Sequence, residues 1–243
     1  PRPAADPRVS ASDRPLIGIT TSLAQDEVGR WRQSLDGDYV DAVEGAGGCP
    51  VIVPMTASRD ALQPLLDRLV GLLITGGPGI TDRLVGDLPD ELQPTLPRRA
   101  EADQWAWESV RQRQRPVLGI CYGMQFINAR LGGSIHADVQ KAPGSRPHSL
   151  SRNGGEEVFH EIDVTQGSVL AGLAAGQRRV NSEHLQAVEE VGAGLSVSAL
   201  STDGLIEAIE TEDGQLLGVQ FHPERMGDTW ATLFGHLVER ARD

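Results

Sequence analysis

Cys121 is the residue of this sequence best placed for nucleophilic chemistry. It follows the apolar run Val117–Ile120, has Gly119 and Gly123 on either side, and precedes a segment with a helical apolar face. Small neighbours let a chain turn sharply from strand to helix and expose one side chain at the edge of a sheet. The free N–H groups at a helix start favour the thiolate, which is the attacking form. This pattern predicts a nucleophilic cysteine, with a buried core thiol as the alternative reading.

His222 and Glu224 could complete such a site. They lie in the segment Leu217–Glu224, where an apolar run ends in His-Pro-Glu. Pro223 biases His222 toward an extended conformation, and residues i and i+2 of an extended chain point to the same side. We therefore expect Glu224 to accept a hydrogen bond from the His222 imidazole while the other ring nitrogen faces the thiol. Alone, a His-Pro-Glu triplet is typical of a surface turn.

A third segment could stabilise the oxyanion that forms when a thiolate attacks an amide. Residues 72–79 read as a strand that runs into a glycine-rich turn. Backbone N–H groups must point at the oxyanion, and those of Gly77 and Tyr122 are the candidates. Pro78 has no N–H, and neither the GxGxxG nor the GK[ST] phosphate-binding pattern is present.

The elements around these residues alternate between strand and helix. Four short apolar runs predict strands buried on both faces, and segments with helical spacing lie between them: the runs are 16–20, 51–54, 69–75 and 116–120. The second half contains alternating or short strands at 158–164, 195–200, 205–210 and 216–221, a turn at 211–214, and a closing helix from about residue 228. This order predicts a three-layer α/β/α fold with a mixed, mostly parallel central sheet, flavodoxin-like in type.

Composition narrows the possible functions. The chain has 243 residues, 39% of them hydrophobic, which is enough to build a core. Its formal net charge of −12 would repel nucleic acids and anionic membranes. No apolar stretch is long enough to span a bilayer, and the first residues do not resemble a secretory signal. Two cysteines cannot make a disulfide framework, which favours a cytoplasmic location. We expect a loose tail over residues 1–14 and one domain over 15–243.

The segments together resemble the class I glutamine amidotransferase superfamily, most closely its γ-glutamyl hydrolase branch of peptidase C26 type, which includes γ-glutamyl-γ-aminobutyrate hydrolase. The resemblance covers nearly the whole chain after residue 14. The cysteine and His-Pro-Glu motifs are shared across the superfamily, whereas Asn-Ser-Glu-His-Leu-Gln-Ala-Val at 181–188 and Asp-Gly-Leu-Ile-Glu-Ala at 203–208 point to the hydrolase branch.

The resemblance implies a role for each matching residue. Cys121 would be the nucleophile, His222 the general base and acid, and Glu224 the orienting carboxylate. Gly77 and Tyr122 would form the oxyanion hole. The substrate-binding positions it implies are Gln125, Glu183, His184 and Gln186, with His184 shaping the pocket rather than transferring protons.

Two positions depart from the branch. Position 122 is Tyr where the branch often has Arg, and Ala100 follows Arg99 where it often has an Arg-Asp pair. Both positions are expected to border the pocket and so to bear on the substrate. Specificity is expected to lie in the loops 78–98 and 141–157, the first of which could act as a lid.

The resulting interpretation is a hydrolase that cleaves the γ-glutamyl amide bond of a small molecule through a Cys thioester, as in polyamine catabolism. No cofactor is expected. No metal is expected either, because His136, His148, His160 and His236 show no local metal-ligand spacing. Three alternatives remain: a glutaminase subunit that delivers ammonia to a separate synthase, a non-catalytic or redox-sensing α/β protein, and a triad whose pocket opens only on partner binding. A homodimer is also possible.

Overall fold

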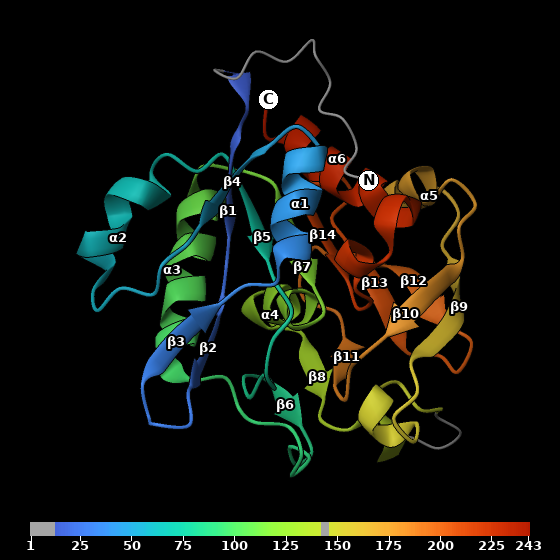
Figure 1. Ribbon diagram of the computed structural model, residues 1–243. Coiled ribbons are helices and arrows are strands. Elements are labelled where there is room, and N and C mark those ends of the chain that lie inside the picture. Colours follow the sequence, from blue (N-terminus) through green and yellow to red (C-terminus); the bar gives the residue numbers. More distant parts are fainter. Residues whose placement is uncertain (1–12, 142–145) are drawn as a thin grey trace.

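A mixed sheet forms the centre of the molecule (Figure 1). The computed structural model describes residues 13–141 and 146–243, so most of the expected tail lies outside the described residues. Five neighbouring strands run parallel, in the order β4 (Cys49–Ile52), β1 (Leu16–Ile19), β5 (Gly71–Ile74), β7 (Val117–Ile120) and β14 (Leu216–Val219). Strands β1, β5, β7 and β14 are almost entirely buried, as their continuous apolar runs predict.

The sheet continues with antiparallel strands beyond β14. These are β13 (Ile206–Glu210), β12 (Ser196–Ser201), β9 (Val158–Val164) and β10 (Arg179–Ser182). The turn predicted at 211–214 joins β13 to β14 as a hairpin. The predicted class, a mostly parallel sheet that becomes antiparallel toward one side, is confirmed.

Helices cover both faces of the parallel part. The core on one face includes apolar side chains of α1 (Gly37–Gly45), α5 (Val169–Ala174) and α6 (Ala231–Arg240). The core on the other face includes those of α2 (Arg59–Leu66), α3 (Pro97–Gln112) and α4 (Tyr122–Arg130). The closing helix begins at Ala231 rather than residue 228, because a 3-10 turn occupies Gly227–Trp230. No helix within the described ranges is long and apolar enough to cross a membrane.

Several short strands have no clear counterpart in the sequence pattern. Strands β2 (Ser22–Gln25) and β3 (Trp31–Ser34) make a separate hairpin, and β11 (Ala187–Glu190) joins β13 to β8 (Ser134–His136). Strand β6 (Leu84–Val85) pairs with β8, so the long connection after β5 is held against the rest of the molecule. Arg152 of the 141–157 loop also links the two expected specificity loops, because its guanidinium contacts Glu91 of the 78–98 loop.

Candidate active site

Cys121 stands at a strained turn between β7 and α4. Its φ of +52° lies in the left-handed region that non-glycine residues avoid, and its N–H donates to the Val219 carbonyl 2.8 Å away. Gly123 allows the turn, since a Cβ there would overlap the Ile74 carbonyl of the neighbouring strand. The thiol is buried but lines a cavity, as the predicted elbow requires.

His222 follows β14, which pairs in parallel with β7. The carboxyl ends of adjacent parallel strands meet at one edge of the sheet, so the imidazole and thiol are brought together there. The His222 Nδ1–H donates to Glu224 Oε1 at 2.7 Å, and both side chains are buried. The route to this bond differs from the expected extended segment, because Pro223–Arg225 forms a 3-10 turn that returns Glu224 toward the ring.

The electrostatics of the site favour the imidazolium. Burial alone would lower the pKa of His222, but its interactions with the Cys121 thiol and the Glu224 carboxylate raise that pKa to about 10. The imidazole is therefore charged near neutral pH and stabilises a thiolate beside it. Such a pair is ready both to attack a carbonyl and to protonate a leaving amine.

Two further side chains hold this arrangement in place. Asn181 on β10 accepts from the His222 N–H at 2.8 Å and donates to the His222 carbonyl at 2.9 Å. Tyr39 on α1 accepts a hydrogen bond from the Gly76 N–H at 3.1 Å, and burial together with the nearby Glu224 carboxylate holds the pKa of Tyr39 well above its usual range. Its hydroxyl therefore stays neutral.

The predicted oxyanion turn follows β5, on the side of β7 opposite β14. The buried Arg99 guanidinium donates to the carbonyls of Thr75 at 3.3 Å and Gly76 at 3.0 Å. Because C=O and N–H point in opposite directions in a trans peptide, the Gly77 N–H points away from Arg99. No acceptor for this N–H occurs among the described residues, and the Tyr122 N–H begins α4, where no intrahelical acceptor exists.

Arg99 is itself held by a buried ion pair. Its Nε lies 3.3 Å from Asp103 Oδ2, one helical turn along α3, and its guanidinium lies 4.4 Å from the centre of the Tyr122 ring. Position 100 is Ala, and the carboxylate partner of Arg99 stands at position 103 instead. The Tyr122 side chain is buried on the protein side of the turn and lines neither cavity, so the expectation that it borders the pocket is wrong.

Two cavities meet at Cys121, and both are also lined by Gly77 and Glu183. The first, of about 260 Å³, extends toward Asp36 and Arg225. The second, of about 250 Å³, is lined by the remaining predicted substrate-binding residues and by two serines: Gln125, His184, Gln186, Ser149 and Ser151.

The predicted binding residues play different structural parts. The Gln186 side chain accepts from the Ile80 N–H at 2.8 Å and donates to the Ile80 carbonyl at 2.9 Å, which fixes the chain after the oxyanion turn. Gln125 donates to the Gln186 carbonyl at 3.0 Å. The Cys121 thiol lies 4.0 Å from the Glu183 carbonyl, while the Glu183 carboxylate accepts from the Leu150 N–H at 3.3 Å. The His184 ring faces Glu207, with its Nε2 3.6 Å from Glu207 Oε1.

Sequence reasoning did not assign Tyr39, Arg99, Asp103 or Asn181 to the site. Asn181 begins the motif at 181–188, and the sequence pattern points to Arg99 only through Ala100, which follows it. The i, i+4 spacing of Arg99 and Asp103 is a signal that could have found their ion pair. Tyr39 has no such signal, because only the packing of α1 against the sheet brings it to Gly76.

This fold, with a cysteine elbow and a histidine at the same edge of the sheet, defines the class I glutamine amidotransferase-like proteins. Two solved structures share it: a GMP synthase subunit described as putative from Thermoplasma acidophilum (TM-score 0.62, 17% identity, 94% of both chains), and the glutaminase domain of the Trypanosoma brucei CTPS (TM-score 0.62, 16% identity, 93% of both chains). The sequence matches the peptidase C26 family over residues 15–224, and the chain belongs to that family.

Relatives with curated names span most of this chain. A "Putative glutamine amidotransferase" of Mycobacterium tuberculosis is 37% identical over 240 residues, 95% of this chain and 76% of that protein. The γ-glutamyl-γ-aminobutyrate hydrolase PuuD of Escherichia coli is 31% identical over 221 residues, 87% of this chain and 86% of that protein. These relatives support a glutamine amidotransferase-like hydrolase.

Proposed function

We propose that this protein hydrolyses the γ-glutamyl amide bond of a small molecule through a thioester on Cys121. The observation that carries the proposal is the convergence of Cys121 and the hydrogen-bonded pair His222–Glu224 at one sheet edge, where two cavities meet. γ-Glutamyl-γ-aminobutyrate is one candidate substrate, because the Escherichia coli relative is named for hydrolysing it.

The proposed reaction uses the residues at this sheet edge in sequence. The Cys121 thiolate attacks the γ-carbonyl carbon, and the Gly77 and Tyr122 N–H groups stabilise the oxyanion. The His222 imidazolium then protonates the amine as the C–N bond breaks. Neutral His222 next takes a proton from water, the hydroxide attacks the thioester, and glutamate leaves as the thiolate is restored.

The two cavities divide the substrate at the scissile bond. The glutamyl group occupies the second cavity, where the Glu183 carboxylate can bind an α-ammonium group and polar groups around Gln125 can bind the α-carboxylate. The leaving amine occupies the first cavity. Arg225 at its wall can bind a carboxylate on that amine, which favours a leaving group larger than ammonia.

The reaction needs Cys121 as a free thiol, and both cysteines of the chain are free. We therefore propose that the protein works in a reducing compartment such as the cytoplasm, without a synthase partner. A glutaminase subunit would instead turn over glutamine efficiently only when its synthase is present.

The test uses the purified chain alone with γ-glutamyl-γ-aminobutyrate, other γ-glutamyl amines, short γ-glutamyl peptides and glutamine. We expect glutamate release from at least one γ-glutamyl amine or peptide at a rate well above that from glutamine, and none from Cys121→Ala. A glutamine-analogue diazo-ketone should label Cys121 and spare Cys49, as mapped by mass spectrometry. Labelling of Cys49 instead, or activity confined to glutamine, would contradict the proposal.

A further inference from the structure

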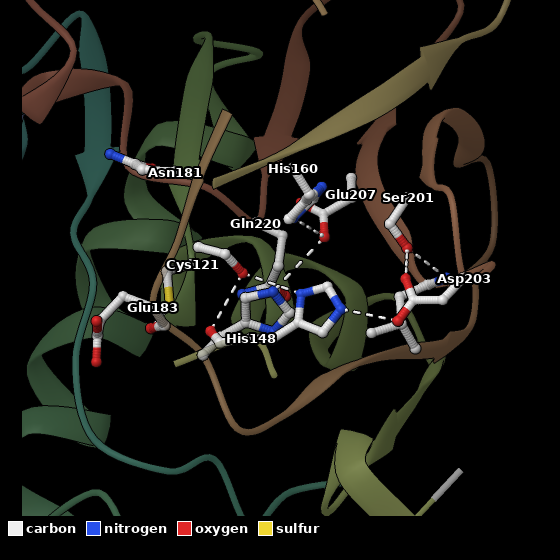
Figure 2. A network of polar contacts seen from close by, with 12 residues as sticks. Cys121, His148, His160, Asn181, Glu183, Ser201, Asp203, Glu207 and Gln220 are labelled. Atoms are coloured by element: carbon white, nitrogen blue, oxygen red, sulfur yellow. Dashed lines mark hydrogen bonds and ion pairs between the residues drawn. The ribbon is translucent and has the colours of Figure 1, made fainter. Parts of the chain in front are cut away.

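A group of imidazoles and a carboxylate lies at the wall of the second cavity, to which His184 contributes, and is separate from Cys121, His222 and Glu224. His148, His160, His184 and Glu207 each offer one ligand atom, and these atoms all lie within 4.8 Å of one another. In Figure 2, His148, His160 and Glu207 gather at one place, with Asp203 beyond His148. We propose that these four residues form a binding site for Zn²⁺.

The hydrogen bonds of His184 and His160 leave the Nε2 atom of each ring facing inward. His184 Nδ1 lies 2.9 Å from the Gln186 carbonyl, and His160 Nδ1 lies 3.2 Å from the Glu161 carbonyl. A carbonyl oxygen only accepts, so each Nδ1 carries a hydrogen, and Nε2 is the nitrogen that is bare in the neutral form of each ring. Backbone contacts of this kind are how proteins orient histidines that bind metals.

The Glu207 carboxylate, fully buried, faces both of these nitrogens. Its Oε1 lies 3.4 Å from His160 Nε2 and 3.6 Å from His184 Nε2. Four buried atoms here have no hydrogen-bond partner among the described residues: Nε2 of His160, Nε2 of His184 and both carboxylate oxygens of Glu207. Four buried acceptors that face one another are unfavourable unless a cation or protons lie between them.

The separations suit a metal ion better than direct hydrogen bonds. Zinc–nitrogen and zinc–oxygen bonds of about 2.0–2.2 Å at tetrahedral angles place neighbouring ligand atoms about 3.3–3.5 Å apart. A charge-assisted hydrogen bond would instead bring nitrogen and oxygen to about 2.7–2.9 Å. The two observed distances of 3.4 and 3.6 Å lie within and just above this ligand–ligand edge. Three imidazoles with one carboxylate are ligands typical of Zn²⁺.

His148 supplies the fourth ligand. Its Nε2 lies 3.1 Å from Asp203 Oδ2, and the Asp203 carboxylate is held by Ser201 at 2.6 Å, so Nε2 carries the hydrogen. His148 Nδ1 lies 3.0 Å from Ser182 Oγ. The hydroxyl of Ser182 has only one hydrogen, which it can donate to the His148 carbonyl oxygen 3.1 Å away instead of to Nδ1. The Nδ1 lone pair can therefore turn to a metal, with Asp203 as the supporting carboxylate.

A closed shell of four protein ligands is a structural rather than a catalytic arrangement. The ion would join β9 and β13 to the segments that carry Ser149, Glu183 and Gln186, all near the second cavity. It would therefore stiffen the wall of that cavity without touching the reacting atoms.

The test measures Zn²⁺ binding directly, in a Cys121→Ser background so that the catalytic thiolate cannot hold the ion. Protein freed of metal by a chelator is titrated with Zn²⁺ against a chromophoric competitor. We expect one equivalent of tightly bound Zn²⁺, a higher thermal midpoint with the metal, and a loss of affinity of about 100-fold or more in His160→Gln and Glu207→Gln. His236→Gln is the matched control, since His236 contacts the Gly214 carbonyl elsewhere, and it should bind as tightly as the parent.

A second measurement does not depend on variants that fold. Co²⁺ added to the Cys121→Ser protein should give the visible bands of a tetrahedral nitrogen and oxygen site, without thiolate charge transfer. Absence of stoichiometric Zn²⁺ binding, or equal affinity in His160→Gln and His236→Gln, would overturn the proposal and leave protons on the histidines to neutralise Glu207. Because no readout involves turnover, failure here leaves the proposed hydrolysis unaffected.

Discussion

At the scale of single residues, the ionisation of His222 governs the chemistry. The fold raises the pKa of this imidazole to about 10, from about 6.5 in an unfolded chain. The stability gained from this shift is fully present below about pH 6.5, and it is lost as the pH rises through about 10. In the proposed reaction, the same imidazolium protonates the leaving amine.

We expect kcat/KM for a γ-glutamyl amide to fall as the pH rises through about 10. Glu224→Gln removes the carboxylate that helps to keep His222 charged, so this alkaline limb should move to lower pH, with a lower maximum rate. The measurement is a pH–rate profile of both proteins, with Glu239→Gln as a control for loss of an exposed carboxylate. An unshifted limb in Glu224→Gln would show that Glu224 does not set the pKa of His222.

Arg99 acts on the oxyanion hole through the backbone. Arg99→Lys keeps the charge but loses the planar group that binds the Thr75 and Gly76 carbonyls together. We expect kcat and kcat/KM to fall together by about 10- to 100-fold, because the Gly77 N–H would lose its direction in the transition state. Arg98→Lys is the control on the same helix; an equal loss there, or a change in KM alone, would contradict this role.

At the scale of elements, the crossing of α4 over β5 depends on Gly123. Gly123→Ala would place a methyl group on the Ile74 carbonyl, and the resulting displacement should lower the free energy of unfolding by about 1–3 kcal/mol or more. Gly172→Ala is the matched change in α5, where an added Cβ meets nothing within 4 Å. It should raise the free energy of unfolding of the protein by about 0.5–1 kcal/mol. Urea denaturation of both variants tests this contrast, and similar values would show that α4 can shift without cost.

The elements also explain why the site is assembled at one edge. The oxyanion turn, Cys121 and His222 follow β5, β7 and β14, which are neighbours in the sheet. Parallel pairing fixes their order and register, so the three segments end together even though they are distant in sequence. The antiparallel strands then bring Asn181 to His222, which lies 41 residues further along the chain.

At the scale of the whole molecule, the two cavities make separable predictions. All substrates share the glutamyl thioester, so the first cavity influences acylation only. Arg225→Gln should lower kcat/KM for γ-glutamyl amines that carry a carboxylate by about tenfold. The changes for uncharged amines and in the deacylation rate should be smaller and equal to each other, because Arg225 Nε also lies 3.6 Å from Glu224 Oε1. Pre-steady-state kinetics with a carboxylate-bearing and an uncharged γ-glutamyl amine measure acylation and deacylation separately, and Arg178→Gln is the control. An equal loss of kcat/KM for both amines would show that the leaving group does not bind beside Arg225.

The sequence by itself was sufficient for the α/β class, the mixed sheet, and the positions of Cys121, His222 and Glu224. These depend on local signals: apolar runs of strand length, glycines where the chain must turn, and motifs of adjacent residues. Local signals did not show that Glu224 reaches His222 through a 3-10 turn, nor that the Tyr122 ring lies against Arg99 rather than in the pocket.

Only the tertiary structure decided which distant side chains meet. Tyr39, Arg99 and Asn181 support the site from three separate elements, and the group at His148, His160, His184 and Glu207 is drawn from four segments with no local metal-binding spacing. The expectation of no metal was based on such spacing, and the proposed Zn²⁺ site departs from it. Spacing records neighbours along the chain, whereas sheet order and register determine neighbours in space.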